Sequence, residues 1–409
     1  MRSSSVSALA LGLLLGAAGC GGATTPQEHP KTPAQTPASA EVVESAPSAD
    51  NGPLDEDPPP GKDGVALSLA VNLVDEGEFS KAIRMMKDLH KRYPNNGVVL
   101  YELGLAYRLA HRPEDAVKLW TPYRSRLEVM ALAGLASALD EAGHPQESIT
   151  MLREELQRHP RSGLLHSELG TTLVNLGKPE EALPIYEKAT QVEPSFAPSY
   201  MHLAELFATT PSRGLTLIHG ETFRLLEPKT ARSQKIGALM MKVCEQALQA
   251  TTPNPVTGAK VALAPTPSIT KMADADKVPV VNQLDIAFGP GLVTAAKSGL
   301  NLAAMHRARR SFLDRMKTPT APKGLGATPL VKWLQALDTA GHLEAYDYWL
   351  YGPADRDAMD EWFASHRPQF ESMAVYLANH PLYPAEPQPL DTPENVTASL
   401  VVPTHEFRL

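Results

Sequence analysis

Residues 167–189 decide the fold and read Ser167-Glu-Leu-Gly-Thr-Thr-Leu-Val-Asn-Leu-Gly-Lys-Pro-Glu-Glu-Ala-Leu-Pro-Ile-Tyr-Glu-Lys-Ala. The first half of this stretch places a small residue, Gly170, directly after a leucine, and the second half carries another, Ala182. Gly177 lies between the halves, where a left-handed turn costs glycine little. The stretch therefore predicts two helices joined by a tight turn and packed closely through their small residues.

The same pattern recurs with a period of 34 residues, because Pro160, Pro194 and Pro228 follow one another at that spacing. A proline cannot continue a helix, so each one ends a repeat. The pattern predicts five repeats, and the second is two residues short: 63–96, 97–128, 129–162, 163–196 and 197–230. A single helical hairpin cannot bury its own apolar face, so the core must form between stacked neighbours.

This period, together with its small residues, turn glycines and closing prolines, resembles the tetratricopeptide repeat. The resemblance implies an all-α helical solenoid over residues 63–250, in which 231–250 form the capping helix. The fifth repeat departs most from the pattern, because Thr216 and Gly220 replace the small and the large residue expected there. The alternative is a generic antiparallel helical bundle.

The chain opens with an apolar run from Val6 to Ala18, which is too short to span a bilayer and is typical of a signal peptide. The following Gly19-Cys20 resembles a bacterial lipobox. That resemblance implies a signal peptide over 1–19 and acylation of Cys20 by fatty acids such as palmitate. Gly21 in place of aspartate favours the outer membrane by analogy. A secreted protein without lipid is the alternative.

Residues 20–62 are rich in proline, alanine and threonine, which predicts a disordered tether. The formal net charge of -8 gives no support to nucleic-acid binding. Cys244 is the only other cysteine, and its apolar helical setting predicts a packed thiol.

The composition changes after residue 250. Residues 251–289 are predicted to form a proline-rich linker or irregular segment, in which Val278–Phe288 is either a strand or an extended arm ended by Gly289. Residues 290–383 are predicted to form a helical C-terminal domain. The remaining residues, 384–409, are predicted to form an extended tail, in which 396–402 are a candidate short strand.

Two features of the C-terminal domain have alternative interpretations. One helix over 292–317 carries a cationic face, which is either solvated or an anion or lipid-headgroup patch: His306, Arg307, Arg309, Arg310 and Arg315. An aromatic block over 346–351 is predicted to be core rather than a binding surface. Residues 337–343 also echo the turn of the third repeat, Leu139-Asp-Glu-Ala-Gly-His-Pro, which indicates a degenerate hairpin of the same kind.

The sequence shows no motif for phosphate, zinc or nucleophilic catalysis. His342, Glu344 and Asp347 lie close in sequence, but a metal site would need further ligands. We therefore predict no catalytic, cofactor-binding or metal-binding residue, no cofactor, and no enzymatic activity.

In the tetratricopeptide family the first helix of each repeat lines a concave groove that binds a partner. Transfer of those positions gives the following candidates: Leu67, Val71, Val74, Tyr101, Leu105, Arg108, Asp140, Glu141, Ser167, Thr171, Asn175, Met201 and Glu205. The N-terminal part of this set is apolar, which favours an apolar segment of a partner.

The expected function is a lipid-anchored scaffold or assembly adaptor in the bacterial cell envelope. Its partner would be another envelope protein or a peptide segment of one. Its organisation is similar to that of pilotin lipoproteins. The alternative is a C-terminal domain with hydrolytic or ligand-binding activity, recruited by the repeats.

Overall fold

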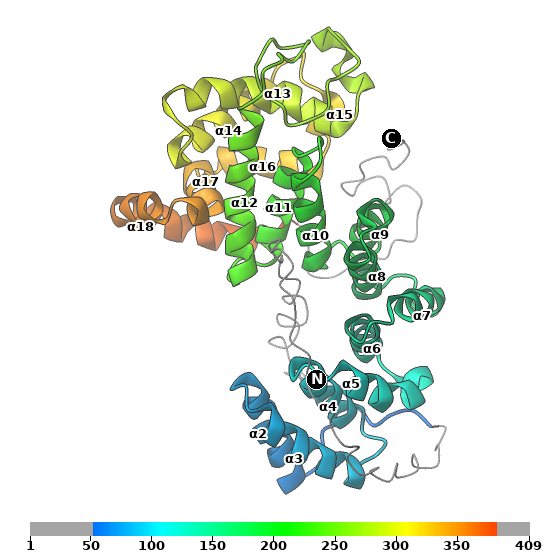
Figure 1. The fold of residues 1–409 in the computed structure, drawn as a ribbon. Helices are drawn as coiled ribbons and strands as arrows, with labels where there is room; N and C mark the ends of the chain where they lie inside the picture. Colours follow the sequence, from blue (N-terminus) through cyan, green and yellow to red (C-terminus); the bar gives the residue numbers. More distant parts are fainter. Residues whose placement is uncertain (1–51, 383–409) are drawn as a thin grey trace, which may run out of the picture. The chain divides into compact units, whose positions relative to one another are not determined.

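The computed structural model describes residues 52–382, and within that range it contains helices and no strand. The predicted all-α fold of helical-hairpin repeats is confirmed (Figure 1). The predicted signal peptide, Cys20, most of the predicted tether and the predicted tail with its strand lie outside the described residues. The chain divides into two compact units, 1–151 and 152–409, and the boundary falls inside one helix, α7 (Pro145–Arg158).

The first unit holds the predicted repeats one and two and most of repeat three. Its helices pair in chain order: α2 (Lys62–Asp75) with α3 (Phe79–Arg92), α4 (Gly97–Leu109) with α5 (Pro113–Trp120), and α6 (Val129–Glu141) with the start of α7. The second repeat is shorter because α5 gives way after eight residues to a 3-10 turn, η1 (Thr121–Arg126).

Trp120 is the central side chain of the first unit and is fully buried. Its indole nitrogen donates a hydrogen bond to the carbonyl oxygen of Leu100, at 3.0 Å. The ring lies against Gly104 of α4, where a Cβ atom would overlap it, and against Gly134 of α6, where a Cβ atom would lie 2.8 Å from it. The small residues predicted from the repeat thus make room for a large neighbour.

One turn geometry joins the paired helices of repeats one to four. The residue at the turn has a positive φ in each case: Gly77, His111, Gly143 and Gly177. The next backbone N–H donates to a carbonyl five residues earlier, as in His144 to Leu139, which is the hydrogen bond of a helix C-cap. Gly341, with a φ of 79°, and the bond from His342 to Leu337 repeat this turn, so the predicted degenerate hairpin is confirmed.

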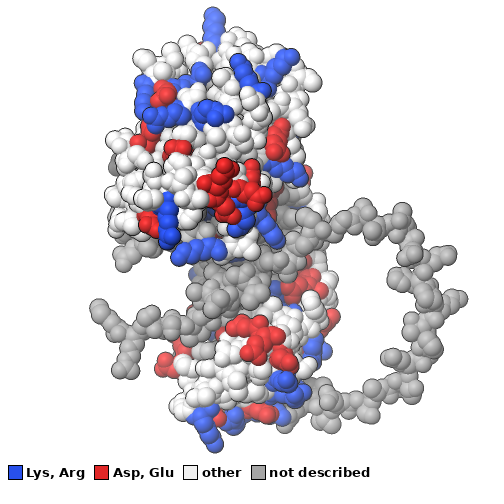
Figure 2. Space-filling model, turned by 90° about the vertical axis from the view of Figure 1, so that its left-hand side faces the viewer, with Lys and Arg blue, Asp and Glu red and all other residues white. Residues whose placement is uncertain are grey.

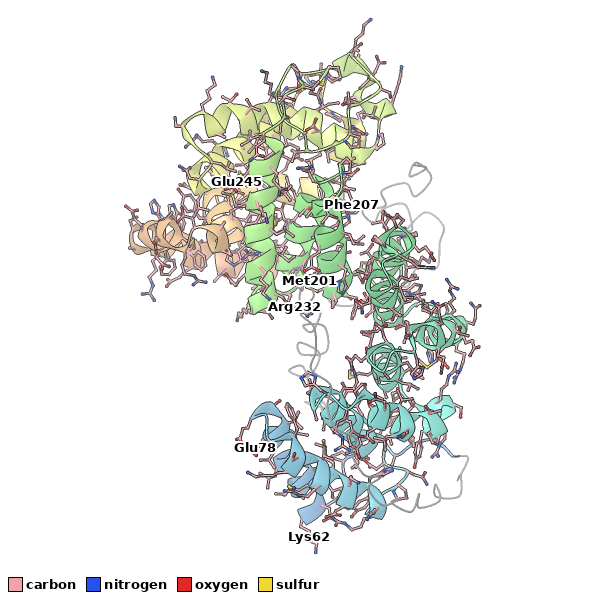
Figure 3. The ribbon with its side chains drawn as sticks, viewed as in Figure 1. Lys62, Glu78, Met201, Phe207, Arg232 and Glu245 are labelled. Carbon is pink, nitrogen blue, oxygen red and sulfur yellow. The ribbon has the colours of Figure 1, made fainter. Side chains whose placement is uncertain are left out.

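The second unit continues the repeats and adds further helices. Its repeat helices are α8 (Gly163–Asn175), α9 (Pro179–Val192), α10 (Ala197–Ala208), α11 (Leu215–Leu226) and α12 (Ala231–Ala247). Figure 3 shows that α10, labelled at Met201 and Phe207, and α12, labelled at Arg232 and Glu245, run in the same direction. The helices that follow are α13 (Val280–Ala295), α14 (Leu302–Met316), α15 (Lys323–Gly326), α16 (Pro329–Thr339), α17 (Leu343–Tyr351) and α18 (Arg356–Asn379).

The two unusual residues of the fifth repeat have packing roles. The hydroxyl of Thr216 donates to the carbonyl oxygen of Ala204, twelve residues earlier, at 3.0 Å. Ser148 of the third repeat donates to Ala136 over the same separation, at 2.9 Å. A Cβ atom on Gly220 would lie 2.9 Å from the sulfur of Met240, so this glycine lets α11 and α12 pack closely.

The prediction of a strand or arm over Val278–Phe288 is wrong. Helix α13 begins at Val280, includes Phe288 and continues through Gly289 to Ala295. Every residue from 281 to 289 is buried, so the helix lacks the polar face that gives a helical period. The preceding irregular segment is fixed by polar side chains of α13. Asp285 accepts hydrogen bonds from Asn254 and from the backbone of Leu263.

The predicted domain boundaries at residues 250 and 289 stay a prediction, and the two units of the structure meet at residue 151. The helix predicted to cap the solenoid exists as α12, but α17 and η4 (Gly352–Ala354) pack on it, so α12 is an internal helix. The predicted tether also ends early, because Leu54 is buried and Asp55 exchanges backbone hydrogen bonds with Asn95 and Gly97.

Candidate functional site

The candidate groove residues of the first unit lie on α2, α4 and α6, the first helices of their repeats. The apolar members Leu67, Val74 and Leu105 are buried, while Val71 and Tyr101 are half-buried. Burial raises the pKa of Tyr101, whose hydroxyl has no hydrogen-bond partner within residues 52–382. The apolar part of the predicted groove is therefore mainly core of the repeats.

A charged pair joins α4 to α6 on the same first-helix face. The guanidinium of Arg108 donates to both carboxylate oxygens of Glu141, at 2.6 and 3.1 Å. Arg108 is buried, whereas the side chain of Glu141 is 39% exposed. Its sequence neighbour Asp140 is half-buried. This bidentate ion pair holds the carboxylate of Glu141 in one orientation at the surface.

The candidate groove residues of the second unit lie on α8 and α10. Ser167 is fully buried, and its hydroxyl lies 2.9 Å from that of Ser199. Thr171 is half-buried and lies 3.1 Å from the hydroxyl of Tyr186. Met201 is buried, whereas Asn175 and Glu205 are exposed.

Taken together, the accessible members of the predicted set are polar or only half-buried. The exposed side chains are Glu141, Asn175 and Glu205, whereas six members are buried: Leu67, Val74, Leu105, Arg108, Ser167 and Met201. An apolar partner segment stays a prediction, and Val65 and Leu69 of α2 are exposed apolar residues outside the predicted set. In the second unit the exposed members of the set are an amide, Asn175, and a carboxylate, Glu205.

Comparison with protein families gives one match, in which residues 133–198 fit the model described as tetratricopeptide repeat. These residues cover α8 and α9, whose turn and whose glycine-against-tyrosine packing at Gly170 and Tyr186 have the repeat geometry. Residues 133–198 are tetratricopeptide repeats. The match covers the third and fourth of the five hairpins.

Two of the solved structures similar to the chain, TTC0263 and YrrB, are described as tetratricopeptide proteins. TTC0263, a thermophilic protein of Thermus thermophilus, is 18% identical, with a TM-score of 0.38, over 44% of this chain and 99% of that one. MamA is 23% identical, with a TM-score of 0.32, over 39% and 95%. YrrB, described as having an unusual peptide-binding site, is 16% identical, with a TM-score of 0.29, over 42% and 89%. No curated protein sequence matches the chain.

Sequence reasoning missed a buried charged network that links the fifth tetratricopeptide repeat to the later helices. Arg309 of α14 donates to Glu221 of α11 at 2.9 Å and lies 3.2 Å from a carboxylate oxygen of Asp347 on α17. The hydroxyl of Tyr346 donates to Glu221 at 2.8 Å, and Nδ1 of His306 lies 2.9 Å from Asp347. The expectation of a solvated side chain at Arg309 is wrong, because this side chain is 7% exposed.

A second arginine makes a similar link without a carboxylate. Arg224 of α11 is fully buried and donates to the carbonyl oxygens of Leu350 and Trp349 at the end of α17. Its guanidinium lies 4.7 Å from the centre of the Trp349 ring. A cation at a helix C-terminus is favourable because unpaired carbonyls point outward there. The aromatic block over 346–351 is therefore mainly core, as predicted.

The other candidate groups have structural partners. Cys244 is a buried thiol, and burial raises its pKa to about 12, which confirms a packed rather than a reactive cysteine. His342 lies against the ring of Tyr376, and Glu344 accepts a hydrogen bond from Trp362 at 3.4 Å. Within residues 52–382 no three potential ligands gather as a metal site, and none of the helices there has the length and apolarity needed to cross a bilayer.

The buried carboxyl of Glu187, on α9, should make the free energy of unfolding depend on pH. Burial raises the pKa of its carboxyl to about 7, and one of its oxygens has no hydrogen-bond partner within the described chain. The folded state binds this proton more tightly than the unfolded state, in which the carboxyl has its ordinary pKa of 4.5. The contribution of Glu187 to stability is therefore fully present below pH 4.5 and is lost as the pH rises through about 7. Glu187→Gln should raise the free energy of unfolding at pH 8 by up to about 3 kcal/mol.

Urea unfolding of wild type and Glu187→Gln at pH 5 and pH 8 measures this difference. The two proteins should be close in stability at pH 5. Glu181, which is exposed on the same helix, provides the control, because Glu181→Gln should change little at either pH. Equal stability of wild type and Glu187→Gln at pH 8 would show that the carboxylate is solvated.

Proposed function

We propose that this protein is a non-enzymatic scaffold whose tetratricopeptide repeats bind a segment of another cell-envelope protein. The match of residues 133–198 to the tetratricopeptide model carries the proposal, because such repeats stack to present the first helices of successive hairpins as one binding face. The exposed amide of Asn175 on α8 and the exposed carboxylate of Glu205 on α10 suit a polar or cationic partner segment.

Site-specific photo-crosslinking in cells tests the binding face. A photoreactive amino acid at Asn175 or Glu205, which are exposed on first helices, should crosslink to one partner protein. The same amino acid at Lys188, exposed on the second helix α9, provides the control and should give no such product. Mass spectrometry of the crosslinked band identifies the partner.

The pattern of crosslinks separates the proposal from its alternatives. A partner captured from Lys188 but from neither first-helix position would place binding on the outer face. An absence of protein crosslinks from all three positions would argue against a scaffold formed by these repeats.

The proposal includes a lipid anchor at Cys20 in the outer membrane. The apolar run from Val6 to Ala18, the small residues before Cys20 and the polar, proline-rich segment after it support this part. Each buried methylene of an acyl chain contributes roughly 0.8 kcal/mol to membrane binding, so several chains hold a protein firmly.

Cys20→Ser should move the protein from the membrane fraction to the soluble fraction, because the hydroxyl of serine is a far weaker nucleophile than a thiolate for lipid transfer. The helical content should stay at the wild-type level, since Cys20 precedes the repeats. Fractionation and mass spectrometry of the wild-type N-terminus check both parts. A wild-type chain with an intact Met1 or an unmodified Cys20 would falsify the anchor while leaving the scaffold proposal standing.

A further inference from the structure

The five cations of the predicted basic face have different surroundings in the structure. Arg309 is buried in the charged network, and His306 pairs with Asp347. Arg310, whose side chain is 52% exposed, forms an ion pair with Asp338. Arg307 and Arg315 remain, and no carboxylate of residues 52–382 forms an ion pair with either of them.

These two arginines line one pocket between α13 and α14. The pocket has a volume of about 240 Å³ and is lined by Pro290, Gly291, Thr294, Ala295, Arg307, Ser311 and Arg315. The lining contains two guanidinium groups and two hydroxyls but no carboxylate. Figure 2 shows a group of blue side chains in the upper part of the molecule, at the height that α13 and α14 occupy in Figure 1.

The spacing on α14 directs these groups to one place. Arg307, Ser311 and Arg315 follow one another at intervals of four residues, so they share one face of the helix. The two arginine Cα atoms are about 12 Å apart along the helix axis, with the serine hydroxyl between them. Long side chains from both ends can therefore reach one anion above Ser311.

The lining groups also have unused hydrogen-bonding capacity. Nε of Arg315 is buried without a hydrogen-bond partner, and neither Ser311 nor Thr294 forms a side-chain hydrogen bond within the described part of the chain. Arg307 donates through one Nη atom to the carbonyl oxygen of Ala295, at 3.2 Å, which orients its guanidinium group. A buried donor without a partner is costly, and an anion in the pocket would satisfy it.

Gly291 gives the pocket its depth. A Cβ atom at this position would lie 2.9 Å from Cβ and Oγ of Ser311 and 3.2 Å from the carbonyl oxygen of Ala308. A side chain on α13 would therefore displace the serine hydroxyl and fill the floor of the pocket.

We infer that this pocket binds a phosphate group carried by a small ester. Two guanidinium groups match the oxygens of a phosphate, and the serine and threonine hydroxyls supply further donors. The volume accommodates a phosphate with a substituent of about the size of glycerol. Such a phosphate occurs both in free phosphorylated metabolites and in the headgroup of a phospholipid. The site is separate from the first-helix surface of the repeats, so it does not depend on the proposed function.

Titration of the purified full chain with inorganic phosphate, at constant ionic strength against chloride, tests the site. Saturable binding is expected in the wild type. The double variant Arg307→Gln/Arg315→Gln should bind about tenfold more weakly or worse, because charge-assisted hydrogen bonds are lost. Arg310→Gln removes the same charge from the same helix outside the pocket and should stay within about twofold of wild type.

Gly291→Ala tests the shape of the pocket without changing its charge. This variant should weaken phosphate binding about as much as the double variant if its circular dichroism shows an unchanged fold. Ser311→Ala serves as the second shape variant, because it removes the central hydroxyl without adding an atom. Wild-type affinity in both the double variant and Ser311→Ala, or phosphate binding that does not saturate, would overturn the inference.

Vesicles distinguish the two sources of the phosphate. Flotation of the Cys20→Ser chain, which lacks the proposed anchor, with phosphatidylglycerol vesicles but not with zwitterionic phosphatidylcholine vesicles would assign the site to an anionic lipid headgroup, provided that the double variant in the same Cys20→Ser chain does not float. Saturable phosphate binding without flotation would assign it to a soluble phosphate ester. Flotation that persists in the double variant, together with no binding of inorganic phosphate, would refute a phosphate site.

Discussion

Arg309→Met is expected to lower the free energy of unfolding of the second unit by about 3–5 kcal/mol. The guanidinium faces Glu221 and Asp347, which are both buried and which would lose their only close arginine among residues 52–382. Burial raises the pKa of each carboxyl, while Arg309 lowers it. Without the arginine both carboxyls should hold their protons to higher pH, because an unpaired buried carboxylate is costly.

The pH dependence of this loss follows from the direction of those pKa changes. A raised folded-state pKa gives stability at low pH that is lost as pH rises, so the deficit of Arg309→Met should be larger at pH 8 than at pH 5. Chemical unfolding at both pH values measures it. Arg310→Met, on the same helix, provides the control and should cost less than about 1 kcal/mol. The side chain of Arg310 is 52% exposed, and its partner Asp338 keeps a second cation, Lys317. An equal loss in the free energy of unfolding for Arg309→Met and Arg310→Met would contradict the prediction. The buried network would then stabilise the fold no more than the single ion pair of Arg310 does.

Gly104→Ala is expected to destabilise the first unit by about 1–3 kcal/mol or more, although alanine is the better helix former. A Cβ atom at residue 104 would overlap the ring of Trp120, which is fully buried and held by its hydrogen bond to Leu100. The ring cannot move away easily, because Gly134 of α6 lies on it as well. Thermal unfolding followed by circular dichroism should show a lower Tm.

A double-mutant cycle separates this clash from other effects of the substitution. Trp120→Leu removes the ring and should cost several kcal/mol by itself, because it leaves a cavity. In that background Gly104→Ala should cost little or become stabilising, since its Cβ atom then fills space. A cost of Gly104→Ala that is the same with and without Trp120 would rule out the predicted contact.

The repeated part of the fold could be read from the sequence because its determinants are local. The turn glycines Gly77, Gly143 and Gly177 set the positive φ that closes each hairpin, whatever the chain does elsewhere. Small residues such as Gly104 and Gly170 lie at fixed separations from the large residues they contact, Trp120 and Tyr186. Five hairpins and the α16–α17 hairpin follow from these spacings.

The burial of the candidate groove residues could not be predicted from the sequence, because it depends on how neighbouring helices pack. The repeat pattern assigns Leu67, Leu105 and Met201 to first helices but does not say how much of each side chain the next hairpin covers. Burial is a property of the packed neighbours, whereas the period specifies only the face of one helix.

The structure of the helices that follow the repeats was even harder to predict from the sequence. The period of 34 residues ends before α13, in which every residue from 281 to 289 is buried, so this part of the sequence carries no amphipathic pattern. Arg309 and Arg315 lie on one helix at six residues' separation, yet one is enclosed by carboxylates and the other lines an open pocket. Sequence determined the repeats through local turn and spacing rules. Only the tertiary structure decided which charges are paired, because their partners on α11 and α17 lie far away along the chain.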